Sequence, residues 1–126
     1  MTVKGDAQQL VAVVDDDESV RLALTAAFRS VGLRAFGFSS AESFMDFGRL
    51  SDIACLITDL KMPGMSGLDL QAKLRRDGYH IPTVFMTAHG IPEARSQAMA
   101  AGAIAFLDKP FDDNFLLETV QKIIAR

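Results

Sequence analysis

The sequence predicts an α/β domain: a doubly wound, five-stranded parallel sheet with helices on both faces. Two observations lead to this fold class. Short apolar runs alternate five times with helical segments, and three of these runs lack any polar interruption, as in strands buried on both sides. Strict alternation gives parallel strands joined by right-handed crossovers. The 126 residues, 49% of them hydrophobic, suffice for one core, so we expect residues 1–126 to form a single domain.

The first unit is a strand over 10–14 followed by a helix that Gly32 ends. Apolar residues at helical spacing mark this helix: Val20, Leu24, Ala27, Phe28 and Val31. The second unit is a partly alternating strand over 34–38 and a short helix closed by Gly48. This helix starts at "SSAE", from Ser39, which has the pattern of a capping box. It carries two aromatic residues, Phe44 and Phe47.

The third unit is a strand over 53–58, the loop "DLKMPGMSG" and a helix that Ser66 caps. Two leucines share one face of this helix: Leu70 and Leu74. The fourth unit is a strand over 83–87 and an alanine-rich helix. Pro92 suits the first turn of that helix and Gly102 stops it.

The fifth unit, a strand over 103–107 and a final helix, completes the sheet. The final helix starts at Asp112 or Asp113 and has the inward-facing residues Leu116, Val120 and Ile123. Strands one, three and four are uninterrupted and belong in the middle, whereas Arg34 suits strand two to an edge. These constraints give the strand order 2-1-3-4-5, with the functional site beyond the carboxyl ends of strands one and three.

The first strand runs directly into acidic residues, in the stretch "LVAVVDDDES". Two like charges 4 Å apart repel by about 4 kcal/mol at the effective dielectric of a protein surface, so we expect a cation beside them. The carboxyl ends of the other strands add further polar side chains. The resulting set is Asp15 and Asp16 after strand one, Asp59 after strand three, Thr87 at the end of strand four and Lys109 after strand five. We expect these five to converge.

These residue types suit Mg²⁺-dependent chemistry on a phosphoryl group. Carboxylates are hard ligands, and Mg²⁺ usually takes one or two of them while keeping several waters. A carboxylate can also attack phosphorus to give an aspartyl phosphate, and Asp59, alone after its strand, is the candidate. Thr87 and Lys109 offer donors for phosphoryl oxygens.

Four segments, "VVDDDES", "LITDLKMPGMSG", "FMTAHG" and "FLDKPF", resemble the receiver domain of bacterial two-component response regulators in order and spacing. The residues of these motifs are most similar to those of receivers of the nitrogen-fixation-regulator type. The resemblance covers nearly the whole chain and implies the flavodoxin-like strand order. Receivers of this type usually carry a helix-turn-helix output domain, so the alternatives are a single-domain receiver or a chain whose output domain lies outside these 126 residues.

The resemblance also implies a role for each site residue. Asp59 would be the phosphoacceptor; Asp16, Asp59 and the Lys61 carbonyl would bind Mg²⁺ directly, and Asp15 largely through water. Thr87 and Lys109 would engage the phosphoryl group. A cis peptide is implied before Pro110. The implied phosphodonor is the phosphohistidine of a histidine kinase or a small acyl phosphate.

We expect the phosphoryl group to act through Thr87 and Phe106, which occupies a position where many receivers have tyrosine. The readout would be the surface formed by the fourth helix, the fifth strand and the fifth helix. Its partner would be a second copy of the domain or an output protein. Repacking the fourth helix should cost little because alanines dominate it.

Composition excludes other functions. The net charge of −3 and the pI of about 5.2 argue against nucleic-acid binding by this domain. The N-terminal stretch "MTVKGDAQQ" fits neither a signal peptide nor a membrane span, so we expect a cytoplasmic protein without membrane contact. Cys55 is expected in the core.

Several single residues have more local interpretations. Asp17 and Glu18 should cap the first helix and complement its dipole. His80 is expected on a surface loop. Lys61 and His89 either border the phosphoryl site or are plain solvated side chains.

Three alternative functions are possible for this sequence. A haloacid-dehalogenase-like phosphatase also combines an aspartate nucleophile with Mg²⁺, but its motif is D-x-D-x-T/V, whereas this chain has D-D-D-E-S and no cap insertion. A flavodoxin would need a phosphate loop rich in serine, threonine and glycine after strand one. The third alternative is a receiver-like interaction module that never turns over phosphate.

Overall fold

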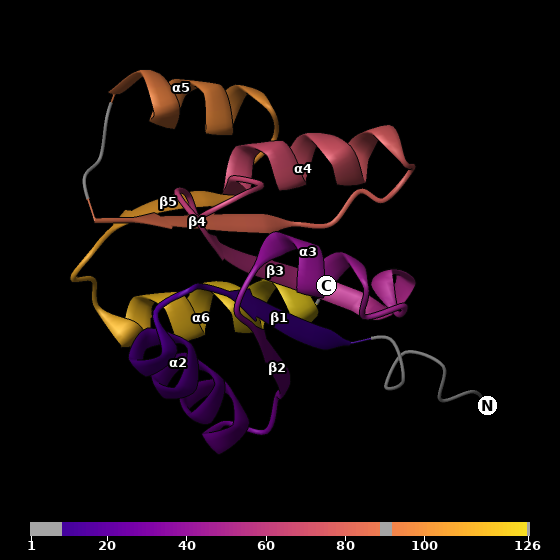
Figure 1. The fold of residues 1–126 in the computed structure, drawn as a ribbon. Helices are drawn as coiled ribbons and strands as arrows, with labels where there is room; N and C mark the ends of the chain where they lie inside the picture. Colours follow the sequence, from indigo (N-terminus) through magenta and orange to yellow (C-terminus); the bar gives the residue numbers. More distant parts are fainter. Residues whose placement is uncertain (1–8, 89–91, 126) are drawn as a thin grey trace.

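The sheet has the predicted strand order. The structure, a computed structural model, describes residues 9–88 and 92–125. Its five parallel strands lie in the order β2-β1-β3-β4-β5 (Figure 1). They are β1 Leu10–Val14, β2 Arg34–Phe38, β3 Ile53–Asp59, β4 Thr83–Thr87 and β5 Ala105–Asp108. The apolar strands β1, β3 and β4 are central, and β2, which begins with an exposed arginine, lies at an edge.

Helices cover both faces of the sheet. Helices α2 and α6 lie on one face, and α3, α4 and α5 lie on the other (Figure 1). Their bounds are α2 Glu18–Ser30, α3 Ala41–Met45, α4 Gly67–Arg76, α5 Pro92–Ala100 and α6 Asp113–Ala125, with a 3-10 turn η1 at Leu50–Asp52. Among the helices of the described residues, none is long and apolar enough to cross a membrane.

Alternate strand residues supply the two cores. Successive side chains of a strand point to opposite faces. In β1, Val11 and Val13 therefore pack with α2 and α6, whereas Ala12 and Val14 pack with α3 and α4. Both cores include predicted helix residues, among them Leu24, Phe28, Leu116, Val120 and Ile123 on one side and Phe44, Leu70 and Leu74 on the other. The apolar periodicity of the sequence thus identified these buried helix faces, but it wrongly included Val31, which is the C-cap of α2 and is exposed.

The fifth strand begins later than predicted. It spans Ala105–Asp108 rather than 103–107. Ala103 instead donates its N–H to the carbonyl of Ala98 at 3.0 Å, just after Gly102 adopts a φ of 99°. These residues close the C-terminal turn of α5, and this turn delays the strand.

The capping box of α3 involves different residues from those expected. Ser40 is the N-cap instead of Ser39, and its hydroxyl accepts a hydrogen bond from Ser43 N at 3.0 Å. The Ser43 hydroxyl accepts one in return from Ser40 N at 3.3 Å. Glu42, the acid of the "SSAE" pattern, is therefore not used for capping. Its carboxylate accepts a hydrogen bond from Met65 N in the loop after β3, at 3.1 Å.

Helix α3 also ends earlier than predicted. Its last residue is Met45, so Phe47 lies beyond the helix, in a turn that Gly48 closes with a φ of 80°. The Phe47 ring still packs against Phe36 and Phe38, at centroid distances of 5.5 and 5.0 Å. Apolar spacing predicted that Phe47 is part of the core, but it overestimated the length of the helix.

Candidate functional site

The five predicted site residues lie at the carboxyl edge of the sheet. Asp15 and Asp16 follow β1 directly, and Asp59 is the last residue of β3. Thr87 ends β4, and Lys109 follows β5. Because these strands are parallel neighbours, their carboxyl ends meet at one edge. Lys109 contacts two of the three aspartates, and the three aspartates lie close together.

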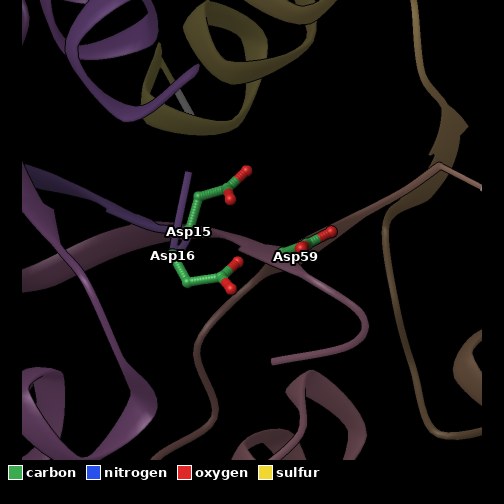
Figure 2. Close-up of side chains that lie close together, drawn as sticks. All are labelled: Asp15, Asp16 and Asp59. Atoms are coloured by element: carbon green, nitrogen blue, oxygen red, sulfur yellow. The ribbon is translucent and has the colours of Figure 1, made fainter. Parts of the chain in front are cut away.

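The three aspartates form an acidic cluster. One carboxylate oxygen of each lies within 4.8 Å of the corresponding oxygens of the other two. Figure 2 shows Asp15 and Asp16 reaching this point from the end of β1 and Asp59 from the end of β3. Asp15 is fully buried, Asp59 is 9% exposed and Asp16 is exposed. The charges repel one another, and burial removes the water that would screen two of them.

Lys109 provides positive charge to two of these aspartates. Its Nζ lies 3.0 Å from Oδ2 of Asp15 and 3.5 Å from Oδ1 of Asp59. Burial alone would lower the pKa of Lys109, but the hydrogen bond to Asp15 and the negative charges of both aspartates raise it. Lys109 is therefore protonated at neutral pH. Within residues 9–88 and 92–125, Asp16 takes part in neither a hydrogen bond nor an ion pair.

Asp59 is in an environment that disfavours its charged form. Burial raises the pKa of Asp59 above its usual value of 3.8, and the charge of Asp15, with a smaller effect from Asp16, raises it further. Lys109 acts in the opposite direction but does not compensate. The Asp59 Oδ1 also accepts a hydrogen bond from Leu60 N at 3.2 Å. A further cation would stabilise the ionised carboxylate.

The donor set fits a divalent metal ion that prefers hard oxygen ligands. Among the described residues, the three clustered carboxylates have one lysine in contact with them, so their negative charges outnumber the positive charge. The exposure of Asp16 leaves one side open to water, and Mg²⁺ usually keeps several waters in proteins. Lys61, whose carbonyl is the other predicted ligand, lies in the loop after β3 with its side chain exposed.

The loop after β3 is held closely against Asp59. Gly67 N donates a hydrogen bond to Leu60 O at 2.9 Å. A Cβ on Gly67 would collide with the carbonyl oxygen of Asp59, so only glycine permits this approach. On the other side of the site, the peptide between Lys109 and Pro110 is cis, as the resemblance implies.

Thr87 and Phe106 lie on the same face of neighbouring strands. The register places Phe85 opposite Phe106 and Thr87 opposite Asp108. Thr87 is two residues after Phe85 on β4, and side chains two residues apart point to the same face of a sheet. Thr87 and Phe106 therefore point to the same face. Thr87 is 3% and Phe106 4% exposed. The Phe106 ring packs in a cluster with Leu60, Phe85, Ala98 and Ala103.

The remaining predicted residues have simple structural roles. Asp17 is the N-cap of α2, and the hydrogen bond from the Ser19 hydroxyl is the largest of the effects that lower its pKa. Cys55 is fully buried, and burial raises the pKa of its thiol to about 12. His80 is exposed, as predicted. His89 lies outside the described residues.

Sequence reasoning missed two arginines that contact site residues. Arg21 donates from Nη1 to the carbonyl of Asp15 at 2.8 Å. Arg95 donates from Nη1 to the carbonyl of Phe106 at 3.2 Å. Arg21 is three and seven residues before the core residues Leu24 and Phe28, so its helical spacing could have indicated that it faces the sheet. Arg95 is likewise three residues before the buried Ala98, but one buried residue is a weaker signal than two.

Comparisons with known proteins point to one family. Residues 11–121 match the family model of the response regulator receiver domain. Nodulation protein W of Bradyrhizobium diazoefficiens is 45% identical over 111 residues, which cover 88% of this chain and 49% of that protein. Transcriptional regulatory protein FixJ of Azorhizobium caulinodans is 40% identical over 116 residues, which cover 92% of this chain and 55% of that protein.

Solved structures give the same result. Response regulator StyR superposes with a TM-score of 0.86 at 44% identity, covering 94% of this chain and 60% of that one. FixJ-N superposes with a TM-score of 0.82 at 34% identity and 94% coverage of both chains. The chain belongs to the response regulator receiver domain family, whose function is phosphorylation-based signalling in two-component systems. It spans about half the length of the curated relatives it matches.

Proposed function

We propose that Asp59 accepts a phosphoryl group from the phosphohistidine of a sensor histidine kinase or from a small acyl phosphate, in a Mg²⁺-dependent reaction. A carboxylate oxygen of Asp59 attacks phosphorus, the bond between phosphorus and the donor atom breaks, and the donor atom keeps the electron pair. The observation that best supports this proposal is that Asp59 shares the acidic cluster with Asp15 and Asp16 and also lies beside Lys109, whose Nζ is 3.5 Å from its Oδ1.

Within this proposal, Asp16, Asp59 and the Lys61 carbonyl hold Mg²⁺ directly, and Asp15 does so largely through water. The contacts of Asp15 support its indirect role, because its two oxygens already accept hydrogen bonds from Lys109 Nζ at 3.0 Å and Asp17 N at 2.9 Å. When bound, Mg²⁺ would neutralise charge on the phosphoryl oxygens.

Lys109 and Thr87 act on the phosphoryl group after transfer. The ammonium of Lys109 pairs with one phosphoryl oxygen, and the Thr87 hydroxyl donates to another. Movement of Thr87 toward the phosphoryl group vacates space on the face it shares with Phe106, and the aromatic ring can enter that space. The consequence is a population shift on the surface of α5, β5 and α6, which would recruit a second copy of the domain or an output protein.

We propose that residues 1–126 act as one receiver domain in the cytoplasm. Its phosphodonor partner would be a sensor histidine kinase. Family membership gives no support to the haloacid-dehalogenase-like phosphatase considered above. A phosphorylation experiment distinguishes the proposed function from that of a receiver-like module that never turns over phosphate.

Intact-protein mass spectrometry tests phosphoryl transfer. The wild-type chain, incubated with Mg²⁺ and acetyl phosphate or phosphoramidate, should gain one phosphoryl group, and Asp59→Asn should gain none. The label should be stable to acid and labile to alkali, as an acyl phosphate is. Equal phosphorylation of wild type and Asp59→Asn would contradict the assignment, and failure of the wild type to react would favour the module that never turns over phosphate.

Calorimetry tests the metal assignment. Mg²⁺ should bind the wild type with modest affinity, and Asp16→Ala should bind it at least tenfold more weakly because a direct ligand is lost. Asp69→Ala is a matched acidic control, since Asp69 is exposed in α4 and caps that helix. Equal Mg²⁺ affinity in wild type and Asp16→Ala would refute the role of Asp16.

A comparison of wild type with Thr87→Ala tests the switch. Removal of the hydroxyl should leave phosphorylation measurable but should reduce the amide chemical shift changes that a beryllofluoride phosphoryl mimic induces across α5 and β5. Sedimentation with and without the mimic would detect a second copy as partner. Identical mimic-induced shifts in both proteins would mean that Thr87 does not couple the site to this surface.

A further inference from the structure

We propose that Arg21 is a positioning residue for the metal site: its guanidinium holds the peptide between Asp15 and Asp16, and Gly37 leaves the space that its side chain needs. This inference rests on the proposed Mg²⁺ site. It assigns a role to two residues outside the acidic cluster, one on α2 and one on the edge strand β2.

The backbone of Asp15 is held on both sides. Its N–H donates to Phe38 O on β2 at 3.0 Å. Its carbonyl accepts a hydrogen bond from Nη1 of Arg21 at 2.8 Å. Hydrogen bonds from a charged donor are stronger than neutral ones, so the bond from Arg21 is the stronger of these two restraints.

The orientation of Asp16 depends on this peptide. The Asp15 carbonyl and the Asp16 N–H belong to one rigid planar unit, so a rotation of the carbonyl turns the Asp16 backbone with it. Asp16 is exposed, and within the described part of the chain its carboxylate has no hydrogen bond or ion pair to hold it. The bond from Arg21 therefore restricts the one cluster member that lacks side-chain contacts of its own.

Gly37 provides the room for Arg21. A Cβ built on Gly37 would lie 2.8 Å from Cγ and 3.1 Å from Cδ of Arg21, closer than side chains normally approach. The stem of Arg21 thus lies directly against the backbone of β2. Because Cγ is near the base of the side chain, it cannot move away without displacing the guanidinium. Glycine weakens a strand interior and often marks such a close approach.

The same helix offers a matched control. Arg29 of α2 also reaches β2, where Nε and Nη2 donate to Ala35 O at 3.0 and 2.6 Å. Ala35 pairs with Val11, well before the carboxyl end of β1. Arg29 therefore makes the same kind of contact without touching the acidic cluster.

The test measures Mg²⁺ affinity by calorimetry and stability by chemical denaturation of the metal-free chain. Arg21→Met, which keeps much of the stem but loses the guanidinium, should weaken Mg²⁺ binding about tenfold, as expected when a residue that orients a ligand is removed. Arg21→Lys should restore part of this loss. Arg29→Met should lower stability but leave Mg²⁺ affinity unchanged.

If Arg21 affected the site only through its positive charge, Arg21→Met would change Mg²⁺ affinity in the opposite direction. Removal of a nearby positive charge would tighten Mg²⁺ binding, whereas loss of positioning weakens it. Gly37→Ala should weaken Mg²⁺ binding in the wild-type background. It should have no further effect on Mg²⁺ affinity in the Arg21→Ala background, because the colliding Cγ is then gone.

Two results would overturn the inference while the proposed function stands, provided that the wild type is phosphorylated normally. The first is an Arg21→Met variant that binds Mg²⁺ as tightly as the wild type. The second is that the effects of the Arg21 and Gly37 substitutions on Mg²⁺ affinity are additive. A wild-type chain that binds no Mg²⁺ would overturn both the inference and the proposed metal site.

Discussion

The guanidinium of Arg95 lies over the ring of Phe106, with Cζ 5.3 Å from the ring centroid, while Nη1 donates to the carbonyl of the same residue at 3.2 Å. These two contacts connect α5 to β5 through the residue that we expect to move in the switch. Ala98 is the one fully buried residue of α5 in the described structure, so the helix has few other anchors. Arg95 therefore stabilises the buried position of Phe106.

Replacement of Arg95 by alanine should make the switch easier to operate. A cation–π contact is worth about 0.5–1 kcal/mol and a hydrogen bond about 1 kcal/mol, so their loss should shift the equilibrium toward the moved state by roughly tenfold. Beryllofluoride titrations followed by amide shifts of α5 and β5 should therefore show a larger mimic-induced change in Arg95→Ala. Glu93→Ala, on the same helix, is the control. An unchanged response in Arg95→Ala would mean that this contact does not oppose the switch.

Replacement of Lys109 by methionine should destabilise the metal-free protein and tighten Mg²⁺ binding. The fully buried carboxylate of Asp15 would lose its ion pair, and loss of one partner of a buried pair costs about 3 kcal/mol. The ammonium also repels a metal ion in the same cluster, so its removal should increase Mg²⁺ affinity. Urea denaturation with and without Mg²⁺ measures both effects. The prediction would be contradicted if Lys109→Met lost as much stability relative to wild type at saturating Mg²⁺ as without Mg²⁺, and bound Mg²⁺ with the same affinity as wild type.

Replacement of Asp59 by asparagine should stabilise the metal-free protein at neutral pH, by about 1 kcal/mol, as is common when an unfavourable charge is removed. The pKa of Asp59 is raised in the folded state, chiefly by burial, so folding takes up a proton between the usual value of 3.8 and the raised value. Wild-type stability therefore falls as pH rises through that window and stays lower above it. The advantage of Asp59→Asn should be full above the raised pKa and should vanish below the usual value.

Denaturation of both proteins across this pH range tests the prediction, because the other titrating groups are common to the two. Saturating Mg²⁺ should reverse the order of stability, since the metal binds the folded wild type more tightly. An advantage of Asp59→Asn that does not change with pH would show that charge on Asp59 is not its cause.

Cys55 should resist thiol reagents in the folded protein. Its side chain is fully buried and its pKa is raised to about 12, so the thiolate that reacts is almost absent at neutral pH. Labelling with iodoacetamide should require unfolding, and it should slow further when Mg²⁺ stabilises the fold. Rapid stoichiometric labelling under native conditions would contradict the buried position.

Local sequence patterns determined the fold class and the membership of the site. Alternation of apolar runs with helical segments predicted the parallel sheet and its strand order. The carboxyl ends of parallel strands lie at the same edge of a sheet. The order of residues alone therefore predicted that the residues following each apolar run lie close together, among them Asp15, Asp59 and Lys109. Helix and strand ends were less predictable, as at Ala103 and Phe47, because hydrogen bonds in the adjoining turns decide them.

Tertiary structure alone decided how the site residues are held. Nothing in the order of residues distinguishes the fully buried Asp15, paired with Lys109, from the neighbouring exposed Asp16. The contacts of Arg21 with the Asp15 carbonyl and of Arg95 with Phe106 depend on how α2 and α5 pack on the sheet. A side chain's partners across elements are set by the packing of segments distant in sequence, whereas periodicity reports only which face of its own element the side chain occupies.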